Sequence, residues 1–163
     1  MSNNKIGFRR VDHVSMTVAD ADATAEFYKR VLGAEERYRI GPLRSADMPP
    51  HTDGRDWTEA FLGVPDATVT LVMLRLGDNF GLELFQYDHP VSPMASPPPS
   101  NFIGAHHIGL EVDDLGGAVA HLNENGCSMM AGPIAMDSGP VAGSRFHYLL
   151  DPFGNILELV SHR

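Results

Sequence analysis

The chain has 163 residues, of which 43% are hydrophobic, and 21 acidic against 12 basic side chains give it a net charge of -9. This length suits one domain, or two small halves that share a core. The negative charge repels phosphate backbones and anionic lipid, so we expect no nucleic-acid partner and no membrane partner.

The number of cysteines limits the kinds of metal site the chain can form, and the opening residues bear on its cellular location. A single cysteine, Cys127, excludes an intrachain disulfide and a thiolate zinc cluster, so any metal would be held by histidine and carboxylate side chains. No run of residues is long and apolar enough to cross a bilayer, and the opening MSNNKIGFRR lacks the apolar segment of a secretory signal. We therefore expect a cytoplasmic protein.

The first predicted strand lies in DHVSMTV, residues 12–18, where apolar and polar side chains alternate. Alternation puts Val14 and Met16 on one face and His13 on the other. A helix follows and ends at Gly33, which can take the left-handed cap conformation. The apolar stripe predicted for this helix consists of Ala23, Phe27 and Val31.

Three further strands are predicted in the first half of the chain, near 35–39, at 67–74 and at 81–87, with LGDN as the turn between the last two. The long segment 41–61 separates the first two of them and is a candidate lid or substrate loop. Trp57 and Phe61 in this segment either pack locally or form a wall of a substrate cavity.

The second half of the chain repeats the first, because HHIGLEVDDLGGAVAHLNENGCS from His106 can be laid over the residues from Asp12. Its helix carries an apolar stripe and ends at Gly126, and strands are predicted near 127–131, at 145–150 and at 155–160. The stripe consists of Leu115, Val119 and Leu122. The chain is therefore predicted to consist of a first βαβββ module at 1–88, a Pro-rich linker at 89–101 and a second module at 102–163.

Alternation also places a histidine and a glutamate of each copy on the face away from its helix. His13 and Glu83 of the first copy oppose the aliphatic residues of their strands, and so do His107 and Glu158 of the second. If these faces line a common concavity, two imidazoles and two carboxylates converge and can bind a divalent ion. This mixed set of donors suits Ni, Co, Mn, Fe, Zn or Mg, and it leaves one or two positions for water or substrate.

The motifs VDHVSMTVADADATAEFYKRVLG, GLELFQY, HHIGLEVDD and DPFGNILELV resemble those of the vicinal oxygen chelate superfamily over essentially the whole chain. This group includes glyoxalase I, methylmalonyl-CoA epimerase, extradiol dioxygenases, and fosfomycin and bleomycin resistance proteins. The resemblance implies an α+β fold in which paired βαβββ modules form a cupped mixed sheet around a metal. It puts His13, Glu83, His107 and Glu158 in the four ligand positions.

The same resemblance implies a metal-dependent lyase or isomerase of the glyoxalase I type. Such an enzyme chelates adjacent oxygens of a small carbonyl substrate and stabilises an enediolate, and Glu158 or Glu83 would act as the base. The alternatives are a ring-cleaving extradiol dioxygenase, a methylmalonyl-CoA epimerase-like enzyme and a drug-sequestering resistance protein. The glutathione-binding arginine expected shortly after the first histidine is absent, because Ser15 and Met16 stand there. We also expect a homodimer, which would cover open sheet edges.

We expect four further side chains to lie near the predicted ligands. Arg145, His147 and Tyr148 lie on the strand beside that of Glu158, but the sequence does not fix which face each of them occupies. His106 has the opposite parity to His107 and is interpreted as a supporting or structural residue.

Overall fold

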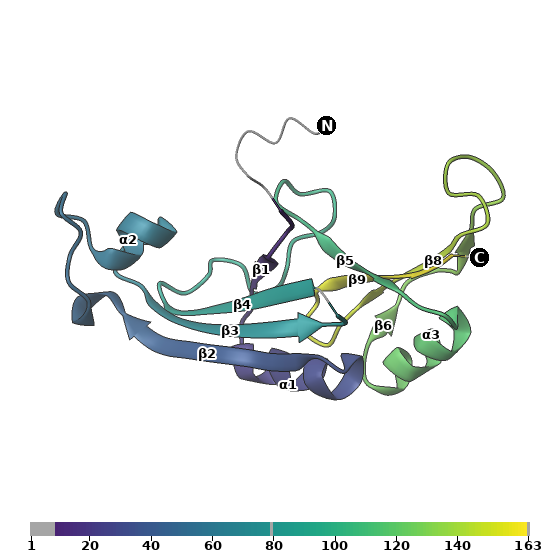
Figure 1. Ribbon diagram of the computed structural model, residues 1–163, viewed down its shortest axis with the longest axis horizontal. Coiled ribbons are helices and arrows are strands. Elements are labelled where there is room, and N and C mark those ends of the chain that lie inside the picture. The colour runs from purple at the N-terminus through teal and green to yellow at the C-terminus, as the bar shows by residue number, and fades with distance from the viewer. Residues whose placement is uncertain (1–8, 79, 163) are drawn as a thin grey trace. The chain divides into compact units, whose positions relative to one another are not determined.

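A computed structural model describes residues 9–78 and 80–162 of the chain (Figure 1). The chain divides into two units, Met1–Ser92 and Pro93–Arg163. The boundary falls within the Pro-rich segment 89–101. Each unit contains its own sheet and its own helix packed on that sheet, so we describe each by itself.

Unit 1 is a four-stranded sheet whose strands lie in the order β1-β4-β3-β2. Strand β1 is parallel to β4, while β3 is antiparallel to both β4 and β2. A short 3-10 helix, η1, and a helix, α2, lie between β2 and β3. The elements are β1 (His13–Thr17), α1 (Ala21–Leu32), β2 (Glu35–Arg44), η1 (Ser45–Asp47), α2 (Trp57–Leu62), β3 (Thr68–Leu76) and β4 (Phe80–His89).

Unit 2 repeats this topology. Its strands lie in the order β5-β9-β8-β6, with β5 parallel to β9, and the additional strand β7 pairs with β8. The elements are β5 (His107–Glu111), α3 (Leu115–Glu124), β6 (Ser128–Met129), β7 (Ile134–Ala135), β8 (Arg145–Leu150) and β9 (Ile156–Ser161). In both units the first strand lies beside the last one, which confirms the predicted repeat and the α+β class.

Helix α1 has the predicted end and a side-chain cap at its start. The Asp20 side chain accepts a hydrogen bond from the Ala23 backbone N–H at 2.8 Å, and Gly33 ends the helix with φ 69°. This pattern satisfies a free N–H at one end and allows a left-handed turn at the other. The predicted stripe was wrong at Ala23, which is exposed, because the phase of the helix turns Ala21, Thr24 and Ala25 inward instead.

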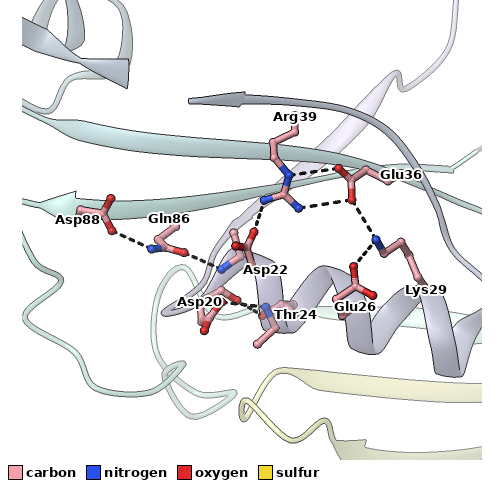
Figure 2. Close-up of polar contacts among 11 residues, drawn as sticks. Asp20, Asp22, Thr24, Glu26, Lys29, Glu36, Arg39, Gln86 and Asp88 are labelled. Atoms are coloured by element: carbon pink, nitrogen blue, oxygen red, sulfur yellow. Dashed lines mark hydrogen bonds and ion pairs between the residues drawn. The ribbon is translucent and has the colours of Figure 1, made fainter. Parts of the chain in front are cut away.

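A polar network ties the outer side of α1 to the sheet of unit 1 (Figure 2). Arg39 of β2 pairs with Asp22 of α1 and with Glu36, and Lys29 of α1 reaches Glu36 at 3.2 Å. At the start of the helix, the Gln86 side chain of β4 accepts from the Ala21 backbone N–H at 2.8 Å. These contacts fix how α1 lies on its sheet.

The two sheets follow the predicted alternation of buried and accessible side chains. Leu82 and Leu84 of β4 are fully buried, and α1 packs on this sheet. Leu157 and Leu159 of β9 are likewise buried in the sheet on which α3 packs. Glu83 and Glu158 lie between these leucines in sequence and so occupy the opposite faces, away from the helices.

The segment 41–61 is more ordered than a simple loop. Strand β2 continues to Arg44, and α2 begins at Trp57 after the N-cap Asp56. The Asp56 carboxylate accepts hydrogen bonds from Ser45 Oγ at 2.6 Å, from Thr58 Oγ1 at 2.8 Å and from the backbone N–H groups of Glu59 and Asp66. One side chain therefore joins both ends of the insert between β2 and β3, residues 45–67, to the helix inside it. Among the described residues, no helix is long and apolar enough to span a membrane.

Candidate functional site

The first predicted pair of ligands comes together in unit 1. His13 Nε2 lies 3.5 Å from Glu83 Oε2, and the Glu83 side chain is 13% exposed. His13 is directly opposite Gly81 in the parallel β1–β4 ladder, and Glu83 lies two residues further along β4. A Cβ at position 81 would lie 2.9 Å from the His13 Cβ and 2.7 Å from the Asp12 carbonyl oxygen, so a glycine is required there.

Asp12 orients the His13 ring from the other side. Its carboxylate lies 2.9 Å from His13 Nδ1, and this hydrogen bond holds the pKa of Asp12 below its usual value. When Nδ1 donates to a carboxylate, Nε2 is left with a lone pair that can bind a metal. The sequence did not identify Asp12 as a site residue, although its position just before His13 was visible.

The second predicted pair comes together in unit 2. His107 Nε2 lies 3.2 Å from Glu158 Oε2, and the Glu158 side chain is 14% exposed. In the β5–β9 ladder Gly109 is directly opposite Glu158. The Glu158 Oε2 atom lies 3.5 Å from where a Gly109 Cβ would be, so the carboxylate passes beside this glycine on its way to His107.

Tyr148 joins this second pair from the neighbouring strand. It is directly opposite Glu158 in the β8–β9 ladder, and hydrogen bonding to the Glu158 carboxylate, followed by burial, raises the pKa of the Tyr148 hydroxyl. The His107 ring meets the Tyr148 ring edge-on, with 5.6 Å between the centroids. Tyr148 thus contacts both predicted ligands of unit 2.

The remaining residues noted in the sequence lie elsewhere. His147 is buried and is opposite Leu159, on the face away from Tyr148, whereas His106 and Arg145 are exposed. Trp57 and Phe61 pack on each other with centroids 5.3 Å apart, which is the local packing considered for them. Cys127 is buried, and burial raises the pKa of its thiol to about 11, as expected for a core residue rather than a reactive one.

Each histidine–glutamate pair has a spacing that suits two neighbouring ligands of one ion. Donors bound at about 2.1 Å lie roughly 3.0 Å apart along an octahedral edge and roughly 3.4 Å apart along a tetrahedral one. The observed separations of 3.2 and 3.5 Å are close to these values. Among residues 9–78 and 80–162, no group of three or more His, Cys, Asp or Glu side chains is placed to hold a metal ion. Each pair therefore brings one histidine and one glutamate together within its own unit.

Similar proteins include several enzymes. A 2-epi-5-epi-valiolone epimerase from an Actinomyces species is 36% identical over 154 residues, covering 93% of this chain and 78% of that protein. A probable chloroplastic lactoylglutathione lyase from Arabidopsis thaliana is 30% identical, and the match covers 93% of this chain and 35% of the plant protein. Human mitochondrial methylmalonyl-CoA epimerase is 32% identical over 119 residues, covering 71% of this chain and 53% of that protein.

A solved structure bears on the fold of this chain, and a family model bears on its family. A glyoxalase family protein from Bacillus cereus has a TM-score of 0.74 and 20% sequence identity, with 99% of this chain and 97% of that chain covered. This likeness confirms the fold. The model of the Glyoxalase/Bleomycin resistance protein/Dioxygenase superfamily matches residues 10–159. This chain is a member of that superfamily.

Proposed function

We propose that this protein is a divalent-metal-dependent epimerase that moves a proton at the carbon next to a carbonyl group. His13, Glu83, His107 and Glu158 would together hold one metal ion. The observation that carries this proposal is the repeat of one His–Glu pair, with donors 3.5 and 3.2 Å apart, at equivalent places in two units of equal topology. A bound divalent ion supplies Lewis-acid stabilisation of the negative charge that develops on the carbonyl oxygen.

The protein's own carboxylates would move the proton. Inversion of a stereocentre requires that a proton leave one face of the carbon and return to the other, so two groups are needed. Glu83 and Glu158 come from different strands of different units and are the candidates for these roles. Each side chain is mostly buried, which limits the access of water to the carboxylate and to a carbanion beside it.

The relatives favour inversion over the other reactions of the superfamily. The 36% identical protein is named as an epimerase of 2-epi-5-epi-valiolone, a ketone, and it is matched along 93% of this chain. The lyase named for lactoylglutathione is less similar, and Ser15 and Met16 stand where a glutathione-binding arginine was expected. We therefore propose a hydroxylated ketone as the substrate class.

Solvent exchange and metal analysis test this function together. The purified protein, loaded with Co²⁺, Ni²⁺, Mn²⁺, Fe²⁺ or Zn²⁺, is incubated in D₂O with 2-epi-5-epi-valiolone. Parallel samples receive a 2-methyl-branched acyl-CoA thioester, a 2-oxoaldehyde hemithioacetal or a catechol. We expect about one metal ion per chain, and deuterium next to the ketone that disappears with a chelator and returns with metal.

Two other results would contradict the proposal. Rapid oxygen consumption with the catechol, without deuterium exchange in any carbonyl compound, would identify a dioxygenase. Absence of both metal retention and exchange would indicate a non-catalytic binding protein.

We also propose that the protein is a homodimer. Strands β1 and β2 are the two outer strands of the sheet of unit 1, and the edges of a sheet are usually paired or covered. Sedimentation at micromolar concentration should give the mass of a dimer, and a monomer there would contradict this assembly.

A further inference from the structure

The two glutamates of the proposed site have different surroundings. Glu158 lies between two polar side chains: Tyr148 is directly opposite it on β8 and also contacts the His107 ring, and His107 Nε2 lies 3.2 Å from the Glu158 carboxylate. Gly109 is directly opposite it on β5 and has no side chain to press on the carboxylate. A carboxylate with two polar neighbours has fewer orientations available than one with a single polar neighbour.

Glu83 lacks such a restraint. The residue opposite it on β3, in the place that Tyr148 takes on β8, is Met73, which is buried and has no hydrogen-bond donor. Within the described chain, the only ion pair or hydrogen bond of the Glu83 side chain is the one with His13, at 3.5 Å. Repeated topology therefore puts a hydrogen-bond donor beside one glutamate and a thioether beside the other.

We propose that Tyr148 is a positioning residue that holds the Glu158 carboxylate in place through its hydroxyl group. This inference rests on the proposed function, in which Glu158 is both a metal ligand and one of two proton-moving groups. Residues that hydrogen-bond to a ligand fix its orientation, and their loss typically lowers metal affinity or activity by about 10- to 100-fold.

The restraint acts on one carboxylate only, so it has a directional consequence. In an epimerase each carboxylate serves one face of the substrate carbon. Loosening Glu158 impairs removal of the proton that Glu158 takes, more than removal of the proton that Glu83 takes. The ratio of exchange rates measured from the two epimers therefore reports on Tyr148, whereas a general loss of folded protein leaves this ratio unchanged.

The variant Tyr148→Phe removes the hydroxyl and keeps the ring that contacts His107. Its matched control is Tyr38→Phe in unit 1, because the Tyr38 side chain is 47% exposed and lies on β2, two strands away from the Glu83 strand β4. For both variants and the wild type we would measure Co²⁺ affinity by calorimetry, the visible absorption of the Co²⁺ form, and initial deuterium uptake from each epimer of 2-epi-5-epi-valiolone in D₂O. Circular dichroism verifies folding.

We expect Tyr148→Phe to bind Co²⁺ about 10-fold more weakly, to change the Co²⁺ spectrum and to alter the exchange ratio of the two epimers. Tyr38→Phe should match the wild type in all three. Equal behaviour of a folded Tyr148→Phe and the wild type would overturn the role of Tyr148. If Tyr148→Phe does not fold, Tyr148→His and Tyr148→Leu replace it, and equal Co²⁺ affinity in these two overturns the role as well. A wild type that binds no metal and exchanges nothing would instead refute the proposed function itself.

Discussion

Unit 1 and unit 2 have the same sheet order and the same His–Glu pair, but they support that pair differently. In unit 1 the additional side chain that contacts the pair contacts its histidine, because the Asp12 carboxylate lies 2.9 Å from His13 Nδ1. In unit 2 the additional side chain contacts the glutamate, through the Tyr148 hydroxyl, and the His107 ring packs edge-on against Tyr148. The repeat therefore conserves where the donors lie and varies how they are held.

This difference shows that the position and the orientation of a donor side chain are set by different parts of the structure. The position of each donor depends on strand register, which is set by a whole ladder of backbone hydrogen bonds and is the same in both units. The orientation of each donor depends on one or two neighbouring side chains, which can differ without any change in the sheet. Comparison of matched variants in the two units can test this separation.

The largest effect is expected from removing a histidine. His13→Ala and His107→Ala should each abolish tight binding of a divalent ion, since each removes one of only four proposed donors, one from each unit. His106→Ala is the control, because His106 is exposed and precedes β5. Calorimetric titration with Co²⁺ measures the affinities. Loss of binding in only one of the two histidine variants would mean that the units do not share a site.

The next largest effect is expected at the glycines that lie beside the two His–Glu pairs, where the same substitution should cost different amounts of stability. Gly81→Ala places a methyl group 2.7 Å from the Asp12 carbonyl oxygen and 2.9 Å from the His13 Cβ, so the strands must move apart. We expect a loss of about 1–3 kcal/mol in the free energy of unfolding. Gly109→Ala meets only Glu158 Oε2 at 3.5 Å and should change stability by less than about 0.5 kcal/mol. Urea denaturation of both variants would detect the difference. Equal stabilities would show that β1 and β4 can move apart at Gly81 at little cost in free energy.

The insert of unit 1 contains η1 and α2, which have no counterpart among the described residues of unit 2, and Asp56 is the residue to test there. Hydrogen bonds, the one from Ser45 being the strongest, hold the pKa of Asp56 well below its usual value of 3.8. A lowered pKa stabilises the folded state above that usual value, and this stabilisation is lost as the pH falls below it. Asp56→Asn should lower the melting temperature at neutral pH, and its difference from the wild type should shrink in acid. Scanning calorimetry from about pH 7 to about pH 3 measures this.

The control for this experiment is Asp47→Asn, an exposed carboxylate in the same insert. Its melting temperature should follow that of the wild type at every pH. A difference for Asp56→Asn that did not change with pH would contradict a stabilisation that depends on the charge of the Asp56 carboxylate.

The smallest effects are expected at the helix N-caps. Asp20 accepts from the Ala23 N–H at 2.8 Å and Asp114 from the Gly117 N–H at 3.1 Å. Asp20→Ala and Asp114→Ala should each cost about 1 kcal/mol of stability, since the capping bond is the same in both units. Thermal unfolding of both variants tests this equality. A much smaller cost for Asp20→Ala would mean that the Arg39–Asp22 and Lys29–Glu36 contacts already hold α1 in place.

Much of the fold could be predicted because alternation and helix caps are local signals. Strand β8 has the predicted bounds of 145–150, and Gly33 ends α1 as expected. Helix α2 was missed although Asp56 and Gly63 are a cap and a left-handed stop, because the proline and glycine residues around them suggested an irregular loop. The two-residue strand β7 forms only by pairing with β8, so no local pattern marks it.

The site was predictable only in part, for a related reason. Alternation gives the face of each donor relative to its own strand, which is how His13, Glu83, His107 and Glu158 were selected. The hydrogen bond from Tyr148 to Glu158 depends on the register between β8 and β9, which pairs residue 148 with residue 158 and not with a neighbour. Residue spacing within one strand carries no information on that register.

The way in which the insert is closed has a consequence for how this protein can evolve. Asp56 binds Ser45 at one end of the insert and the Asp66 backbone at the other, and the Ser45 N–H donates to the Ala67 carbonyl at 2.9 Å. Strain from a longer or shorter tip is confined beyond these bonds, so residues 48–55 form a cassette that can be exchanged while the sheet keeps its register. A lineage of such proteins can change the length and sequence of this cassette without altering the strands that carry the histidines and glutamates.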